Sequence, residues 1–166
     1  MADIVNNPIW IKKMEVQFDA LDFDGNGSLD PKNFRLYARK LAGILEEGQK
    51  QADEYYKVLM EVFYDHDHGK QMTEIEFIDH MGTLVKGPEA KTVVDKYSEM
   101  ICKIVDPENK DFILYKAFEA TLKAANFGKR FSNKMFAEID TNRDGVITKP
   151  QIKVALFEYL CTAKRF

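Results

Sequence analysis

The fold of this chain is decided by a twelve-residue stretch near its N-terminus: Asp22-Phe23-Asp24-Gly25-Asn26-Gly27-Ser28-Leu29-Asp30-Pro31-Lys32-Asn33. Oxygen-bearing side chains stand at the first, third, fifth and ninth positions. Glycine stands at the sixth position, where a sharp turn needs a positive φ, and the eighth position is apolar. The pattern predicts a tight loop that holds a divalent cation through oxygen atoms.

These spacings are those of an EF-hand loop. Its ligands come from positions 1, 3 and 5, the backbone carbonyl of position 7, position 9 (often through a water) and a bidentate Glu at position 12. The loop departs from the pattern at position 12, where Asn33 replaces Glu. The candidate ligands are therefore Asp22, Asp24, Asn26, the carbonyl of Ser28, Asp30 and Asn33.

A second close match begins at Asp140. It has glycine at position 6 and again lacks Glu at position 12, where Gln151 stands. Its candidate ligands are Asp140, Asn142, Asp144, the carbonyl of Val146, Thr148 and Gln151. Two in-register matches, each with apolar residues at helical spacing on both sides, make a pair of unrelated Asx-rich turns a poor explanation.

Two further loops are degenerate. The loop that begins at Asp65 has Glu at position 12 but Lys70 at position 6, and its weaker candidate ligands are Asp65, Asp67, the carbonyl of Gln71 and Glu76. His66 and His68 stand at positions 2 and 4, which point away from the metal. The loop that begins at Asp106 carries Lys110 at position 5 and Ala117 at position 12, so we expect it to bind no metal because Lys110 places a positive charge at the ion's position.

The four acidic segments begin at Asp22, Asp65, Asp106 and Asp140, at intervals of 43, 41 and 34 residues. Apolar residues at helical spacing flank each one. The sequence therefore predicts an all-α fold of four EF-hand helix-loop-helix units, in two pairs packed into one compact globule.

Residues 86–88, Lys-Gly-Pro, break the helical pattern and divide the chain into an N-terminal pair (9–86, loops 22–33 and 65–76) and a C-terminal pair (90–163, loops 106–117 and 140–151). EF-hands work in pairs, so the degenerate loops still have a structural role. We expect Leu29 to pair with Met72, and Ile113 with Ile147.

Composition excludes several other classes of protein. The chain has 166 residues and a net charge of −3, which does not favour nucleic acid as a partner. The two cysteines, Cys102 and Cys161, lie in apolar helical stretches and are expected to be reduced thiols. No apolar run is long enough to span a membrane, and no signal peptide is evident. These features favour a cytoplasmic monomer without a membrane partner. No grouping of nucleophile and base suggests an enzyme.

A family resemblance extends beyond the loops. The segment Trp10-Ile11-Lys12-Lys13-Met14, which leads into the first loop, resembles the opening of invertebrate sarcoplasmic calcium-binding proteins, and it is similar to their bacterial relative calerythrin. The stretch Phe77-Ile78-Asp79-His80-Met81, continuing through Val85 to Lys91, resembles the annelid members. The resemblance implies two EF-hand pairs packed face to face and buffering of Ca²⁺, with Mg²⁺ as competitor. Coelenterazine-binding proteins and calcium-regulated photoproteins are structural relatives of that family.

Three functions remain open. The leading hypothesis is a calcium and magnesium buffer with weakened sites. The alternative is a carrier that holds an apolar small molecule in the aromatic core between the two halves. The third is a calcium sensor, although the methionines are dispersed rather than gathered in one groove.

Overall fold

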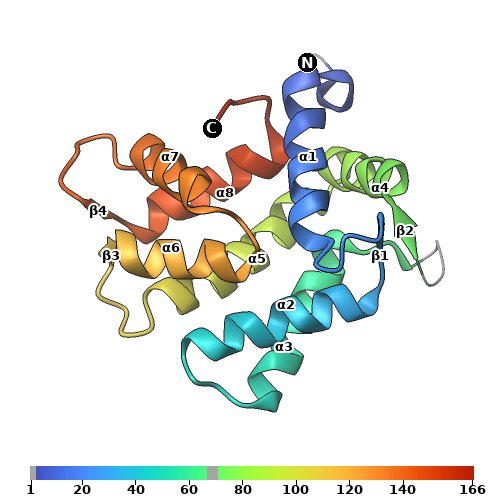
Figure 1. Ribbon diagram of the computed structural model, residues 1–166. Coiled ribbons are helices and arrows are strands. Elements are labelled where there is room, and N and C mark those ends of the chain that lie inside the picture. Colours follow the sequence, from blue (N-terminus) through green and yellow to red (C-terminus); the bar gives the residue numbers. More distant parts are fainter. Residues whose placement is uncertain (1–2, 67–70) are drawn as a thin grey trace.

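A computed structural model of the chain describes residues 3–66 and 71–166. Within these residues, an N-terminal 3₁₀ turn precedes eight α-helices, and one short strand lies between the two helices of each successive pair. This confirms the predicted fold class (Figure 1). The elements are η1 (Ile4–Asn6), α1 (Pro8–Leu21), β1 (Ser28–Leu29), α2 (Pro31–Ile44), α3 (Gln49–Phe63), β2 (Met72–Thr73), α4 (Glu74–Lys86), α5 (Ala90–Val105), β3 (Ile113–Leu114), α6 (Tyr115–Ala124), α7 (Lys129–Ile139), β4 (Val146–Ile147) and α8 (Lys149–Cys161). None of the described helices combines the length and the apolar character that crossing a bilayer requires.

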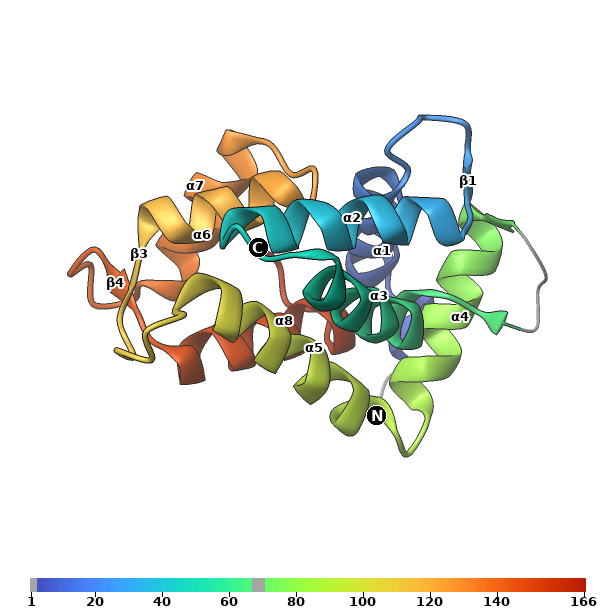
Figure 2. The ribbon, with the colours of Figure 1, turned by 90° about the horizontal axis from the view of Figure 1, so that it is seen from below.

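The strands join the loops in pairs. Strand β1 pairs antiparallel with β2, placing Leu29 opposite Met72, and β3 pairs antiparallel with β4, placing Ile113 opposite Ile147. Both registers are as predicted. All four of these side chains are buried, so each strand pair closes one end of the hydrophobic core. The two strand pairs lie at opposite ends of the molecule (Figures 1 and 2).

The helices begin where the sequence supplies caps. Asn7 accepts a hydrogen bond from the backbone N–H of Ile9 at the start of α1, and proline occupies the first turn of α1, α2 and α8. Proline suits this position because the first N–H groups of a helix have no partner within the helix. Helix α4 ends at Lys86 and α5 begins at Ala90. We propose that this connection separates the two EF-hand pairs.

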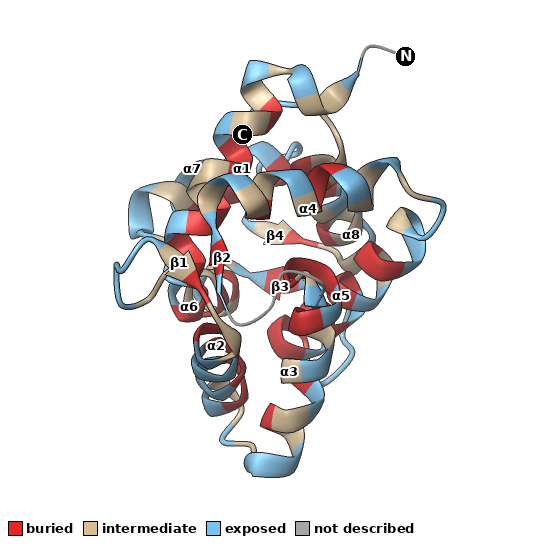
Figure 3. Cartoon of the chain, turned by 90° about the vertical axis from the view of Figure 1, so that its right-hand side faces the viewer, coloured by how far each residue is buried: buried red, intermediate tan, exposed pale blue. Residues whose placement is uncertain are grey.

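One hydrophobic core runs through both halves, as the buried inner faces of the helices show (Figure 3). Helices α3 and α5, α2 and α6, and α1 and α8 pack against each other across the two halves. Among the described residues, Cys102 is buried, Cys161 is half-buried, and neither forms a disulfide.

Hydrogen bonds from side chains of α1 join this helix to the C-terminal end of α8. The indole N–H of Trp10, whose side chain is fully buried, donates to the carbonyl oxygen of Leu160 at 2.7 Å. Leu160 lies in the last turn of α8, where carbonyl groups have no partner within the helix. The Lys13 ammonium donates to the carbonyls of Glu158 (3.0 Å) and Thr162 (2.6 Å). Burial lowers the pKa of Lys13 to about 8.

Replacement of Trp10 by Phe is therefore expected to lower the free energy of unfolding by about 1–3 kcal/mol, because a buried carbonyl loses its donor and a cavity opens. Denaturant unfolding followed by circular dichroism measures this change. Leu36→Ala, which shortens a partly exposed side chain on α2, is the matched control and should have a smaller effect. Equal stability of Trp10→Phe and the parent protein would contradict the assigned role.

Candidate metal centre

The first loop holds its leading carboxylate in a fixed position. Asp22 Oδ1 accepts from the backbone N–H of Asn26 (3.2 Å), and Oδ2 accepts from that of Gly27 (2.9 Å). Gly25 and Gly27 have φ values of +65° and +80°, the left-handed conformation that glycine adopts most readily. The loop is therefore folded around the Asp22 carboxylate by hydrogen bonds within the protein itself.

The fourth loop repeats this geometry. Asp140 Oδ1 accepts from the backbone N–H of Asp144 (3.3 Å), and Oδ2 accepts from that of Gly145 (2.9 Å). Gly145 has φ of +80°, as expected for position 6, but Arg143 at position 4 also has a positive φ of +56°. This second left-handed position was not predicted, although Gly25 at position 4 of the first loop is a signal for it in the sequence.

Positions 3 and 5 form an amide–carboxylate pair in both loops. The Asn26 amide donates to Asp24 Oδ2 at 3.0 Å, and the Asn142 amide donates to Asp144 Oδ2 at 3.0 Å. Among the described residues, no three acidic, histidine or cysteine side chains converge into a ready-made metal cage. The candidate ligands of each loop are nevertheless all oxygen atoms, which suit the hard cations Ca²⁺ and Mg²⁺.

Position 12 has a second role, because it is also the third residue of the exiting helix. Asn33 Oδ1 accepts from the backbone N–H of Asp30 at 2.9 Å, and the Asn33 side chain is buried. Gln151 Oε1 accepts from the backbone N–H (2.8 Å) and the hydroxyl (3.1 Å) of Thr148. The Gln151 amide also donates to the carbonyl of Ile139 at 3.3 Å. Both side chains close a capping box, so their oxygens already have partners within the protein.

The second loop closes in the same way. Glu76 Oε2 accepts from the backbone N–H of Thr73 at 2.7 Å and from its hydroxyl at 3.0 Å. The His66 ring packs edge-on against Tyr64. Asp65 and Gln71 are described, with Asp65 half-buried and Gln71 exposed, whereas Asp67, His68 and Lys70 lie outside the described residues.

The third loop keeps the backbone form of a metal loop. Asp106 accepts from the backbone N–H groups of Lys110 (2.9 Å) and Asp111 (2.8 Å). Asn109 and Asp111 take the left-handed conformation, with φ of +55° and +57°. Asn and Asp tolerate that conformation better than other residues with a Cβ. This loop has therefore lost ligands without losing its shape.

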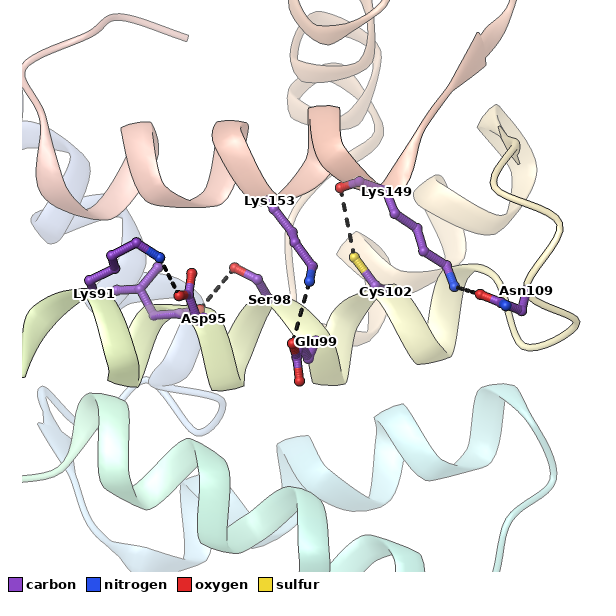
Figure 4. Close-up of polar contacts among 9 residues, drawn as sticks. Lys91, Asp95, Ser98, Glu99, Cys102, Asn109, Lys149 and Lys153 are labelled. Carbon is purple, nitrogen blue, oxygen red and sulfur yellow. Dashed lines mark hydrogen bonds and ion pairs between the residues drawn. The ribbon is translucent and has the colours of Figure 1, made fainter.

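The cation that faces Asp106 is Lys149 and not Lys110, which the sequence had suggested. Lys110 pairs with Glu108, whereas the ammonium of Lys149, from the start of α8, lies 3.5 Å from Asp106 Oδ2. The Lys149 ammonium also donates to Asn109, as Figure 4 shows, and its backbone N–H donates to Asp111 Oδ1 at 3.0 Å. Lys149, at the start of α8 after the fourth loop, therefore places its positively charged ammonium group in the third loop.

Two opposing effects set the pKa of Asp106. Burial would raise it, but hydrogen bonds from the backbone N–H groups of Lys110 and Asp111 and the charge of Lys149 lower it below its ordinary value. The carboxylate is therefore ionised at neutral pH and is paired with an ammonium group of the protein itself. This supports the expectation that the third loop takes no metal ion, with Lys149 in place of Lys110 as the main reason.

Replacement of Lys149 by Met should lower the thermal stability of the calcium-free protein, because the buried Asp106 carboxylate then loses its cationic partner. Circular dichroism melting curves measure the change. The same substitution in an Asp106→Asn background is the control and should cost much less, since no carboxylate remains to be paired. Equal losses in the two backgrounds would show that the ion pair has no stabilising role.

Comparison with known proteins agrees with this geometry. The EF-hand family model matches residues 133–150, from α7 through the fourth loop to the start of α8. The sarcoplasmic calcium-binding protein of Hediste diversicolor is 33% identical over 106 residues, which is 59% of this chain and 59% of that protein. The match therefore spans about three-fifths of the curated relative.

Solved structures show the same fold over nearly the whole chain. The Ca²⁺-regulated photoprotein mitrocomin from the jellyfish Mitrocoma cellularia has a TM-score of 0.77 at 17% identity, over 96% of this chain and 87% of mitrocomin. The coelenterazine-binding protein from Renilla muelleri, in its calcium-loaded apo form, has a TM-score of 0.69 at 18% identity, over 100% of this chain and 94% of that protein.

The fold and the loop geometry are similar to those of EF-hand proteins, whose family model matches the fourth loop. Within that class, the chain resembles the sarcoplasmic calcium-binding proteins of annelids. This confirms the resemblance seen in the sequence.

Proposed function

We propose that the chain binds one or two divalent cations, Ca²⁺ with Mg²⁺ as competitor, in the loops 22–33 and 140–151. The observation that carries this proposal is the matched pair of loops in which Asp22 and Asp140 are held by the amides of positions 5 and 6. The ligands are those named from the sequence: Asp22, Asp24, Asn26, the Ser28 carbonyl, Asp30 and Asn33 in the first loop, and Asp140, Asn142, Asp144, the Val146 carbonyl, Thr148 and Gln151 in the fourth.

Both sites are expected to be weaker than a Glu-terminated EF-hand. An amide at position 12 offers one neutral oxygen in place of two charged ones, and here it must also leave a capping hydrogen bond to reach a cation. Six oxygens suit Mg²⁺, whereas Ca²⁺ prefers more. The preference for Ca²⁺ over Mg²⁺ should therefore be small. The first site should be the tighter one, because Asp30 supplies a third carboxylate.

The second loop is a weaker candidate. It retains Asp65 and Glu76, with the carbonyl of Gln71 and the undescribed Asp67 as further ligands. Glu76 is the position-12 carboxylate of this loop, but in the structure it caps α4.

In a cell, these sites would make the protein a cytoplasmic buffer of the sarcoplasmic type. A calcium sensor needs an apolar surface for its target, often rich in methionine. The six methionines that lie in the described residues are all buried, and they are Met14, Met60, Met72, Met81, Met100 and Met135. A buffer needs no protein partner, no membrane and no nucleic acid, and it would act as a monomer without catalysing a reaction.

Calorimetric titration with Ca²⁺, with and without Mg²⁺, tests this function. We expect one or two sites whose apparent affinity for Ca²⁺ falls in Mg²⁺. A hydrophobic dye that brightens sharply on addition of Ca²⁺ would favour the sensor instead. Absence of any heat of binding would contradict cation binding altogether.

A second candidate function, a carrier of an apolar small molecule, is favoured by one observation. A cavity lies in the core where helices of both halves meet.

A further inference from the structure

A groove on the surface of the molecule runs between α1 and α7. Both helices pack against α8, and the residues that follow α8 lie between them (Figure 1). The volume of the groove is about 740 Å³. Its floor is apolar and is made by Ile9, Val16, Phe131, Tyr159 and Phe166. Tyr159 is buried and the other four are half-buried, so the floor is accessible to the side chains of a partner.

The charged side chains that line this groove are all positive. They are Lys12, Lys13, Arg130, Lys134 and Arg165, and among the described residues no aspartate or glutamate lines it. The whole chain has a net charge of −3, so the groove is opposite in sign to the molecule as a whole. Such a local concentration of one charge creates a positive potential that attracts an acidic partner.

Most of these charges are available to a partner. The side chains of Arg130, Lys134 and Arg165 are exposed, and they form no hydrogen bond or ion pair with any other described residue. Lys12 pairs with Glu15 at 2.9 Å, but an exposed pair of this kind contributes little stability and is readily exchanged. Four cations can therefore be matched by carboxylates from outside the molecule.

The positions of these charges suit a helical partner. Arg130 and Lys134 are four residues apart on α7, so they lie on one face of the helix about 6 Å apart along its axis. Carboxylates at positions i and i+4 of a second helix have the same spacing. Gly128, the N-cap of α7, also lines the groove, and no side chain caps this helix. Its first N–H groups therefore add a partial positive charge.

We propose that this groove binds an acidic amphipathic helix of another protein, with the apolar stripe of that helix on the floor and its carboxylates on the cations of the two walls. An occupant with a single carboxylate would leave most of the cations unmatched, because they stand on α1, on α7 and after α8. A flat membrane surface would not reach a floor that is recessed between two helices. The inference goes beyond the buffer function, which requires no partner. It does not depend on cation binding, since no lining residue belongs to the candidate ligand sets.

Two matched synthetic peptides test the proposal. Each has about 14 residues, which is roughly four turns of helix, and carries a leucine stripe along one face. The first has glutamate at i, i+4 spacing on both sides of the stripe, and the second has glutamine there. Fluorescence anisotropy of the labelled peptide, titrated with the full-length protein in calcium-free buffer, measures the affinity. We expect the glutamate peptide to bind at least about tenfold more tightly than the glutamine peptide. Its affinity should fall as salt is added, because salt screens exposed charge pairs.

Arg130→Glu with Lys134→Glu should weaken binding of the glutamate peptide at least about tenfold, because two attractions become repulsions. Both side chains are exposed and unpaired among the described residues, so the fold should accept the change. Lys50→Glu with Lys123→Glu is the matched control, since these exposed lysines lie on α3 and α6, outside the groove. It changes the net charge equally and should leave the affinity nearly unchanged.

In ¹⁵N NMR of the parent protein, the amide signals of Gly128 and Lys134 should shift as the glutamate peptide binds. Equal affinities of the two double variants, or unmoved Gly128 and Lys134 signals at saturation, would overturn the assignment of the groove. Failure of the glutamate peptide to bind, with binding to phosphatidylglycerol vesicles in its place, would overturn the helical partner. Calcium titration of the same sample separates the proposals, since a protein that binds Ca²⁺ but not the peptide disproves only the groove.

Discussion

Replacing Asp22 and Asp140 together by Ala is expected to remove most divalent cation binding, with apparent affinity for Ca²⁺ falling at least about 100-fold. Position 1 supplies a full negative charge to the cation in each loop, and Coulomb attraction at ligand distance is the largest single contribution to binding. The same carboxylates also accept the amides that shape the loops. Each single substitution should remove one site, and calorimetry reports the stoichiometry.

Asp19→Ala with Glu138→Ala is the matched control, since both residues are acidic and lie on the helices just before the two loops. This control removes the same charge but no ligand, so it should retain nearly full binding. Full stoichiometry in the Asp22→Ala, Asp140→Ala protein would show that the ions bind elsewhere.

Restoring the acid at position 12 is expected to have the opposite effect. Gln151→Glu should tighten Ca²⁺ binding about 10- to 100-fold, because it adds a carboxylate that can supply two oxygens. Glu76 shows that a glutamate can close the same capping box, with Thr73 in place of Thr148. The fold should therefore accept the change. Asn33→Glu should act in the same direction but less strongly, since Asn33 is buried and a longer side chain must be accommodated there.

Gln51→Glu adds an equal charge beside Lys103 on the outside of α3 and α5, and it should leave the calcium affinity unchanged. If neither position-12 change tightens binding, then position 12 is not a ligand and the assigned ligand sets are wrong. Competition with Mg²⁺ adds a second readout, because a seventh oxygen should favour Ca²⁺ over Mg²⁺.

Local spacing was enough to predict the fold and the loop pairing. Apolar residues at helical intervals define the helices, and an apolar residue at position 8 of each loop predicted that Leu29 meets Met72 and that Ile113 meets Ile147. These features could be predicted because each depends on a short run of sequence and on the pairing of neighbouring hands.

Contacts between distant segments could not be predicted in this way. Lys149 enters the third loop because β3 and β4 pair, and a lysine at position 10 of the fourth loop has no meaning until that pairing places it beside Asp106. The burial of Gln17 could not be predicted either, because it depends on helices of both halves that enclose this residue of α1. The capping role of Asn33 could have been predicted from the sequence, because position 12 of the loop is also the third residue of a helix.

The central claim, that the first and fourth loops bind the cation and the third does not, is tested most directly by ¹⁵N NMR during a Ca²⁺ titration. The backbone N–H groups of Gly27, Gly145 and Asp111 each donate to the leading carboxylate of their loop. A cation bound to that carboxylate should polarise the hydrogen bond and shift the amide signal downfield. We predict large saturable shifts for Gly27 and Gly145 and no comparable shift for Asp111. Saturation of the protein with Gly27 and Gly145 unmoved, or with Asp111 shifting alongside them, would contradict the account.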